Sequence, residues 1–473
     1  MLDDIAHRLT RGAQVLLLGL CMRDTAFAHA SERGMVMLLP THYYLVGGTL
    51  AVAIAFVVLG LVPARSIRRV FAWRSGAFTI PTVVQLNLSW ASFLLLALLT
   101  YVGFAGSRDP LSNLLPLTIW TVWWVGLTLL HGVFGNLWVA VNPWSGPYWL
   151  VARLWCRPVS SGFLELPASL GYGPAIIGFA AFAWFELISL APDDPDVLAT
   201  AVIVYWVYTL LGILVFGQKD WCERVECFAV FFRLVSRLAL VQPGKKGLVC
   251  SVPGAGVLSH PGLPVSGALF LLLTLAAVSF DGLNKTFWWL GLNGINPLEF
   301  PGRSAVTWIN IVGLAMTFML LSAAYALAVW IGWRLAGHQG SFADHVGGFV
   351  LSIIPISLAF HMAHYLALLL INGQYVLVAA SDPFSQQLDL LGYTDYRVTG
   401  SWLTDQHTVA LIWKLQAGVI VCGHILAVVL SHALALQRYG HTRGAVISQT
   451  PLTVVMVVYT WFGLWLLATP VAG

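Results

Sequence analysis

Residues 353–374 read IIPISLAFHMAHYLALLLINGQ. The stretch is long and apolar enough to cross a bilayer as a helix, because about 20 apolar residues span a hydrocarbon core of roughly 30 Å. It also carries two histidines, His361 and His364, three positions apart and therefore on one helical face. An ionisable side chain at that depth is costly, so such residues mark candidate functional sites.

The whole chain has the composition of this stretch. Of its 473 residues, 59% are hydrophobic and only 9% are charged, whereas soluble domains carry about 25% charged residues. This excludes a soluble enzyme and a disordered protein. The formal net charge of +4 is spread along the chain without a basic block, which excludes a nucleic-acid binder.

The apolar runs predict the fold class. We expect an all-α, polytopic membrane helix bundle of about ten transmembrane helices, forming a single integral membrane domain over 31–473 in contact with the lipid bilayer. Two other segments, 145–157 and 221–240, mix basic, acidic and aromatic residues and predict one or two cytoplasmic interfacial helices. The predicted spans are 43–63, 87–105, 114–134, 173–190, 197–217, 266–281, 305–333, 347–372, 409–433 and 450–469.

The first 30 residues have the pattern of a cleaved signal peptide. Arg8 and Arg11 precede a short apolar run that ends near Met22, and small residues follow it up to Ala30. An uncleaved amphipathic segment is the alternative. With the mature N-terminus outside, fifteen basic residues lie in loops on the cytoplasmic side and five in the opposite loops. This asymmetry predicts a bacterial cytoplasmic (inner) membrane protein with both ends outside.

The histidines predict a metal site. At about 1.5 Å per residue, His361, His364 and His424 reach similar depths in neighbouring antiparallel helices, and His432 and His131 lie about two turns nearer the cytoplasm. Imidazoles converging in an apolar site are typical ligands of zinc or copper, and two facing histidines are typical axial ligands of haem b. The alternative is that each histidine only hydrogen-bonds a neighbouring helix.

Four other residues are candidates for substrate contact or access. Glu186 and Lys414 are both expected within two turns of the outer surface, where they either form a buried ion pair or line a water-filled opening. Tyr365 lies beside the two histidines of the eighth predicted span. Asp382 begins the long loop 381–400, which either covers an outward-facing cavity or is a plain solvated loop.

Several catalytic motifs are missing from the sequence. It has no Gly-x-x-x-x-Gly-Lys-Ser/Thr phosphate loop, no His-Glu-x-x-His and no Cys-x-x-Cys-His. Only one His-x-x-His is present, whereas membrane di-iron hydroxylases need several histidine clusters. The residues therefore assign no catalytic side chain.

Four segments resemble a family of bacterial multi-pass membrane proteins labelled fenitrothion hydrolase-like. They are GNLWVAVNPWSG (135–146), HMAHYLALLLINGQ (361–374), SDPF followed by LDLLGYTDYRV (381–398), and GHILAVVLSHALAL (423–436). The similarity runs in order from about Ala28 to Leu436. The chain departs from the family at His29-Ala30, where the family has histidine-glycine, and at Ala433, where it has an aspartate.

The resemblance implies a membrane-bound hydrolase of apolar phosphotriesters. A metal held by His361, His364 and His424 would polarise a phosphoryl oxygen and activate water, and an apolar substrate would reach the site from the bilayer. The alternatives are a haem- or copper-binding redox or copper-handling subunit, in which His29 offers a second copper site, and, third, a transporter that uses Glu186 and Lys414. Protein partners are not predicted.

Overall fold

The computed structural model describes residues 41–155, 162–245, 247–259, 261–393, 395–400 and 405–472. The predicted signal peptide and His29 lie outside the described residues.

Nine helices in the described part of the chain are long and apolar enough to cross a membrane. They coincide with nine of the ten predicted spans, so the all-α membrane helix bundle is confirmed. They are α2 (Thr41–Leu61), α4 (Thr82–Ala105), the α5–η2–α6 run (Leu114–Phe134), α10 (Pro195–Phe216), α14 (Val265–Asn284), α16 (Arg303–Leu335), the α17–η6–α18 run (Phe342–Ser381), α19 (Gln406–Tyr439) and α20 (Thr442–Ala468).

The remaining predicted span, 173–190, is the shorter helix α9 (Gly173–Leu187). Its 15 residues extend for only about 22 Å, less than the thickness of a hydrocarbon core. The guanidinium of Arg303, at the start of α16, donates to the backbone carbonyls of Glu186 and Ser189 at 2.9 and 3.1 Å. A cation at this position stabilises the exposed carbonyls at the end of α9.

Two of the spans change their helix type along their length. The third consists of α5 (Leu114–Pro116), the π-helix η2 (Leu117–Leu127) and α6 (Thr128–Phe134). The eighth consists of α17 (Phe342–Phe349), the 3-10 helix η6 (Val350–Ile353) and α18 (Ile354–Ser381). Pi-helical turns are rare and often lie at functional sites.

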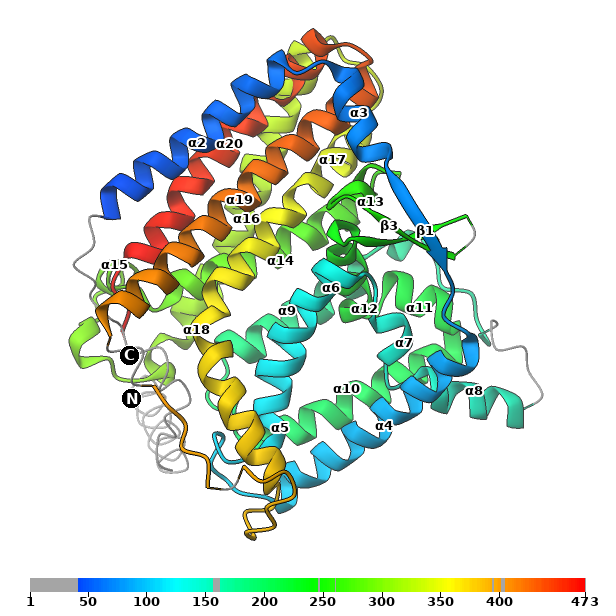
Figure 1. The fold of residues 1–473 in the computed structure, drawn as a ribbon, viewed down its shortest axis with the longest axis vertical. Coiled ribbons are helices and arrows are strands. Elements are labelled where there is room, and N and C mark those ends of the chain that lie inside the picture. The colour runs from blue at the N-terminus through cyan, green and yellow to red at the C-terminus, as the bar shows by residue number, and fades with distance from the viewer. Residues whose placement is uncertain are drawn as a thin grey trace, which may run out of the picture.

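The long helices form two groups, which Figure 1 shows on either side of α9, α14 and α18. In one group α2, α16, α19 and α20 lie side by side; in the other, α4 and α10 pack against each other and against α5. Large apolar side chains on α2 and α16, such as Val57 and Met319, are exposed. Since water cannot solvate such surfaces favourably, they are the surfaces that contact lipid.

A small antiparallel sheet lies at one edge of the bundle (Figure 1). Strands β1 (Arg74–Phe78), β3 (Gly247–Ser251) and β2 (Val241–Gly244) are paired in that order, with Arg74 opposite Ser251 and Val241 opposite Cys250. It joins chain segments that are about 170 positions apart in sequence, so no local pattern predicted it. The remaining short elements are α3 (Ala64–Ala72), α7 (Trp138–Val141), η3 (Ala168–Leu170), α13 (Ala255–Leu258), α15 (Phe287–Leu292) and η5 (Pro297–Glu299).

The two segments predicted as surface helices differ in their surroundings. Segment 145–157 contains α8 (Ser145–Leu154), whose Leu154 is exposed and whose Arg153 lies over the ring of Trp149. Segment 221–240 contains the end of α11 (Gln218–Arg224), then α12 (Cys227–Val235) and η4 (Ser236–Leu238). Helix α12 is buried inside the bundle rather than lying on a surface, because its aromatic side chains pack against α6 and α9.

Candidate functional site

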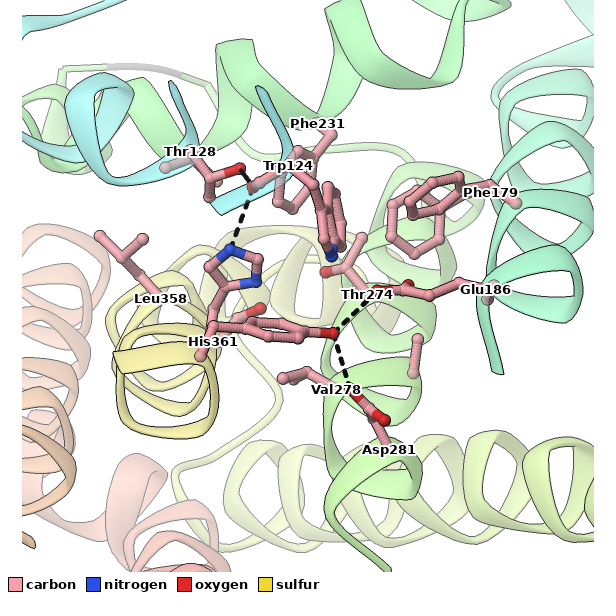
Figure 2. Close-up of a pocket in the computed structure, with 16 residues that line it drawn as sticks. Trp124, Thr128, Phe179, Glu186, Phe231, Thr274, Val278, Asp281, Leu358 and His361 are labelled. Carbon is pink, nitrogen blue, oxygen red and sulfur yellow. Dashed lines mark hydrogen bonds between the residues drawn. The ribbon is translucent and has the colours of Figure 1, made fainter. Parts of the chain in front are cut away.

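A small cavity of about 20 Å³, room for about one water molecule, lies among α9, α14, α18 and the third span. Six elements contribute to its wall, which is mostly apolar and aromatic. Figure 2 shows the side chains, among them Trp124 of η2, Thr128 of α6, Phe179 and Glu186 of α9, Phe231 of α12, Asp281 of α14, and His361 and Tyr365 of α18. Aromatic walls with a few convergent polar groups are typical of small-molecule sites.

Two carboxylates converge on one hydroxyl in this wall. Tyr365 Oη lies 2.8 Å from Glu186 Oε1 and 2.6 Å from Asp281 Oδ2, and Figure 2 shows the two acids reaching it from different helices. His364 approaches the same Asp281 oxygen, with its Nε2 at 2.9 Å. Four residues from α9, α14 and α18 thus form one network, which we call the acid site.

The number of hydrogen-bond donors in the acid site indicates which of its two carboxyl groups carries a proton. A tyrosine hydroxyl carries one proton and donates to one acceptor at a time. Asp281 Oδ2 has donors in both Tyr365 and His364, so it is the natural acceptor. The short contact between Tyr365 and Glu186 is then favourable only if the Glu186 carboxyl carries a proton and donates it to Tyr365 Oη.

His361 is held by the backbone of the π-helix. Its Nε2 lies 3.1 Å from the carbonyl oxygen of Trp124, which also accepts a hydrogen bond from the hydroxyl of Thr128. Nε2 is therefore the protonated nitrogen, since a carbonyl oxygen only accepts. The ring stands at 90° to the indole of Trp124, with centroids 5.0 Å apart.

The indole nitrogen of Trp124 makes no hydrogen bond of ordinary geometry in the described residues, although Glu186 and Tyr365 lie close to it. Trp124 is 6% exposed, and its Nε1 has no hydrogen-bond partner. A buried donor without an acceptor is costly. Because Trp124 lines the cavity, its indole N–H is available to an acceptor atom of a bound molecule.

The structure brings together four of the predicted residues: His361, His364, Tyr365 and Glu186. The other three histidines lie elsewhere. His131 is fully hydrogen-bonded, with Nδ1 at 2.7 Å from the Leu127 carbonyl and Nε2 accepting from the backbone N–H of Trp138. It also stacks on Phe232 with ring centroids 4.2 Å apart. These contacts match the packing alternative for His131.

His424 and His432 lie between α19 and α20. His424 packs against the rings of Phe360 and Tyr459, and its Nδ1 lies 2.8 Å from the carbonyl of Ile420. His432 Nδ1 lies 2.8 Å from the side-chain nitrogen of Gln449. In the part of the chain that the structure describes, no three His, Cys, Asp or Glu side chains are grouped so that they could hold a metal ion. A metal or haem therefore stays a prediction.

The remaining two candidates lie away from the cavity. Lys414 is on an exposed face of α19, and among the described residues no ion pair joins it to Glu186, which hydrogen-bonds to Tyr365 instead. Asp382 accepts hydrogen bonds from the backbone N–H groups of Gln386 and Gln387 at 2.8 and 2.6 Å. Its carboxylate thus stabilises a turn of its own loop.

Outside the spans, Glu226 is a second buried carboxylate. It is 0% exposed and accepts four hydrogen bonds, from Tyr205, from the indole of Trp138, and from the backbone N–H groups of Phe228 and Ala229. Burial raises the pKa of Glu226, and the four donors oppose that rise. The last two bonds cap the first turn of α12.

Two residues of the site were missed by the sequence reasoning. Asp281 is the final residue of the predicted span 266–281, where a carboxylate looks like part of a polar loop. The structure extends the helix to Asn284 and buries Asp281 to 8% exposure. Trp124 is one of 21 tryptophans, and only its place on the π-helix next to His361 distinguishes it.

Comparison with known proteins identifies no relative. No protein-family model, no curated protein and no solved structure matches the chain. The fenitrothion hydrolase-like resemblance therefore stays a prediction, and function has to be argued from the site.

Proposed function

We propose that this chain is a proton-coupled membrane carrier for a small, largely apolar solute, in which Glu186 takes up and releases the proton. The observation that carries the proposal is the position of Tyr365 Oη between the oxygens of Glu186 and Asp281. Ionisable residues that face a cavity inside a membrane bundle typically belong to an ion or proton pathway.

Loss of the Glu186 proton would place a second negative charge beside Asp281. One tyrosine proton cannot satisfy both carboxylates, and repulsion between them is strong in an apolar cavity. The network would then rearrange at the junction of α9, α14 and α18. Such a change would couple protonation to the shape of the cavity wall.

The cavity wall also indicates the type of solute. Its aromatic rings favour an apolar molecule, for which the cavity has to widen, and the indole N–H of Trp124 is a donor for an acceptor oxygen or nitrogen of that molecule. We also propose, from the fifteen-to-five distribution of basic residues, that the carrier lies in the bacterial inner membrane with both ends outside.

The proposal is tested with purified protein in proteoliposomes that contain a pH-sensitive dye. A neutral nitrophenyl phosphotriester is the probe, because it has an apolar ring and a phosphoryl acceptor. We expect an outward gradient of the probe to drive a pH change in vesicles with wild-type protein, and Glu186→Gln to abolish it. Glu299→Gln, an exposed carboxylate of η5, is the matched control; equal signals from both variants would contradict the proposal.

A metal-dependent hydrolase of apolar phosphotriesters is the second candidate. The observation in its favour is that Asp281 and Glu186 lie in the same cavity wall as His361 and beside His364, although the sequence separates them by about 80 residues or more. Carboxylate and imidazole together are common metal ligands. As described, however, these residues form no three-ligand group, so we derive no reaction step from a metal.

The same probe separates the two candidates. A hydrolase releases coloured nitrophenolate, whereas a carrier moves the triester unchanged. Zinc and copper analysis of wild-type protein and of Asp281→Asn, with an absorption spectrum of the same samples, tests metal and haem binding. Metal or haem content near one per chain that is lost in the variant would favour an enzyme or a redox subunit over a carrier.

A further inference from the structure

Between α19 and α20 lies a second group of buried polar side chains, which we call the polar seam. Its members are His424, Ser431 and His432 of α19 and Gln449 and Thr453 of α20, each 3% exposed or less. A hydrogen bond of 2.8 Å between His432 and Gln449 joins the two helices. None of these side chains lines the cavity of the acid site.

Each member of the polar seam has an atom without a hydrogen-bond partner. The atoms are His424 Nε2, Ser431 Oγ, His432 Nε2, Gln449 Oε1 and Thr453 Oγ1. Buried polar atoms in proteins are almost always satisfied, if not by protein then by ordered water. Inside a membrane the requirement is stricter, because lipid offers no hydrogen bonds.

Within α20, the hydroxyl groups distinguish the seam from its surroundings. A serine or threonine in a helix usually donates to the carbonyl three or four residues earlier. Thr450, Thr460 and Ser448 of α20 do so, at 2.7, 2.8 and 3.0 Å. Thr453 lies among them and does not, and neither does Ser431 on the facing helix.

The spacing of the seam fits a row of small molecules. His424 and His432 are eight residues apart, which is about 12 Å along a helix, too far for direct contact. Thr453 lies one turn beyond Gln449 and therefore between these two depths. His424 Nδ1 faces the Ile420 carbonyl, so its neutral ring presents an acceptor at Nε2, which is a suitable partner for water.

Both ends of the seam continue into other polar groups. Toward mid-depth, His424 packs near Tyr459, whose hydroxyl lies 2.5 Å from Ser279 Oγ, and Ser279 is two residues before Asp281. At the other end, Tyr439 lies two turns beyond His432 and contacts His345 at 2.9 Å. At the same end, Arg438 contacts His345 and donates to the backbone carbonyl of Asp344.

We propose that the polar seam holds a chain of internal water molecules that leads from the α17 end of the bundle to the Tyr459–Ser279 pair at mid-depth. The chain explains all five unpartnered atoms with one kind of ligand. The role of this water chain, which is to give protons access to the region of the acid site, rests on the proposed function. The presence of the water molecules does not depend on that function.

The test is radiolytic hydroxyl-radical labelling of the full-length protein in lipid nanodiscs, because side chains next to bound water are labelled even when they are buried. The reporter is Met456, 2% exposed and one turn from Thr453 on α20; the dry control is Phe270, 0% exposed on α14. We expect Met456 to be labelled several-fold faster than Phe270, after each is corrected for its intrinsic reactivity.

Two threonine variants complete the experiment. Thr453→Val removes the unpartnered hydroxyl and should reduce Met456 labelling at least twofold, whereas Thr450→Val, on the exposed face of α20, should leave it unchanged. Corrected rates that are equal for Met456 and Phe270 would overturn the water chain, as would equal labelling in both variants. Neither result would affect the proposed function, which fails separately if Glu186→Gln leaves the proton signal unchanged.

Discussion

Glu226 is completely buried and Glu186 lies partly buried in the cavity wall, and the two carboxyl groups have different neighbours. Four donors surround Glu226, and each of its two carboxylate oxygens accepts two of these hydrogen bonds. Glu186 shares its hydrogen-bond partner Tyr365 with a second carboxylate. A carboxylate among donors is held as an anion and anchors structure, whereas a carboxylate that shares a donor with another acid has to hold a proton.

The largest difference is expected when each glutamate becomes glutamine. Glu226→Gln turns an acceptor into an NH₂ group that faces N–H and O–H donors, so it should destabilise the protein by about 3 kcal/mol. Glu186→Gln replaces a protonated carboxyl with an amide that still donates to Tyr365, and should cost about 1 kcal/mol or less. Thermal unfolding in one detergent measures both. Equal losses of stability would remove the distinction between the two sites.

The next largest effect is expected at the shared hydroxyl. Tyr365→Phe keeps the ring but takes the hydrogen-bond partner from Glu186 and one donor from Asp281. We expect a loss of about 2 kcal/mol in the free energy of unfolding. The double variant with Glu186→Ala should lose less than the sum of the two single variants, because both substitutions remove the same hydrogen bond. Additive losses in this double-mutant cycle would show that Tyr365 does not couple the two residues.

A smaller effect is expected at the cavity wall. Trp124→Phe preserves the aromatic packing and removes the unpartnered N–H donor. We expect the concentration of the nitrophenyl triester that gives half-maximal proton signal to rise about tenfold, which corresponds to about 1.4 kcal/mol, with the maximal signal retained. Trp184→Phe, an exposed tryptophan of α9, is the control. An unchanged half-maximal concentration would mean that Trp124 does not bind the probe.

The smallest effect concerns pH. Because burial raises the pKa of Glu226 above its ordinary 4.5, the folded protein binds this proton more tightly than the unfolded chain. Its contribution to stability is complete below about pH 4.5 and is lost as the pH rises through the folded-state value. Relative to Glu226→Gln, wild-type stability should therefore fall as the pH rises above about 4.5. A relative gain of stability over that range would show that the donors outweigh burial.

The spans were predictable because hydrophobicity alone decides them. Every predicted span corresponds to a helix in the described residues, and α9 differs only in being short. The burial of α12 was not predictable, because in the sequence the polar residues near it have the pattern of a solvent-facing surface. In the structure Glu226, one of these residues, accepts four hydrogen bonds within the bundle. The π-helix was likewise hidden, because its hydrogen-bond register leaves no mark in residue type.

Three of the four residues of the acid site were predictable. His364, Tyr365 and Glu186 stood out as polar residues in apolar runs, as the cost of their burial requires. Their grouping did not, because the order of helices around the cavity is set by packing between distant segments. Glu186 was therefore paired with Lys414, which the sequence places at a similar depth, rather than with Asp281, which the end of its predicted span concealed.

Infrared difference spectroscopy of the purified protein tests the central claim most directly. A protonated carboxyl absorbs at a frequency distinct from that of a carboxylate, and the band shifts in heavy water. We predict that wild-type protein shows this band at neutral pH, that Glu186→Gln removes it, and that Glu226→Gln leaves it in place. If the band is missing from the wild type, or persists in Glu186→Gln, Glu186 does not hold the proton and the account of the acid site is wrong.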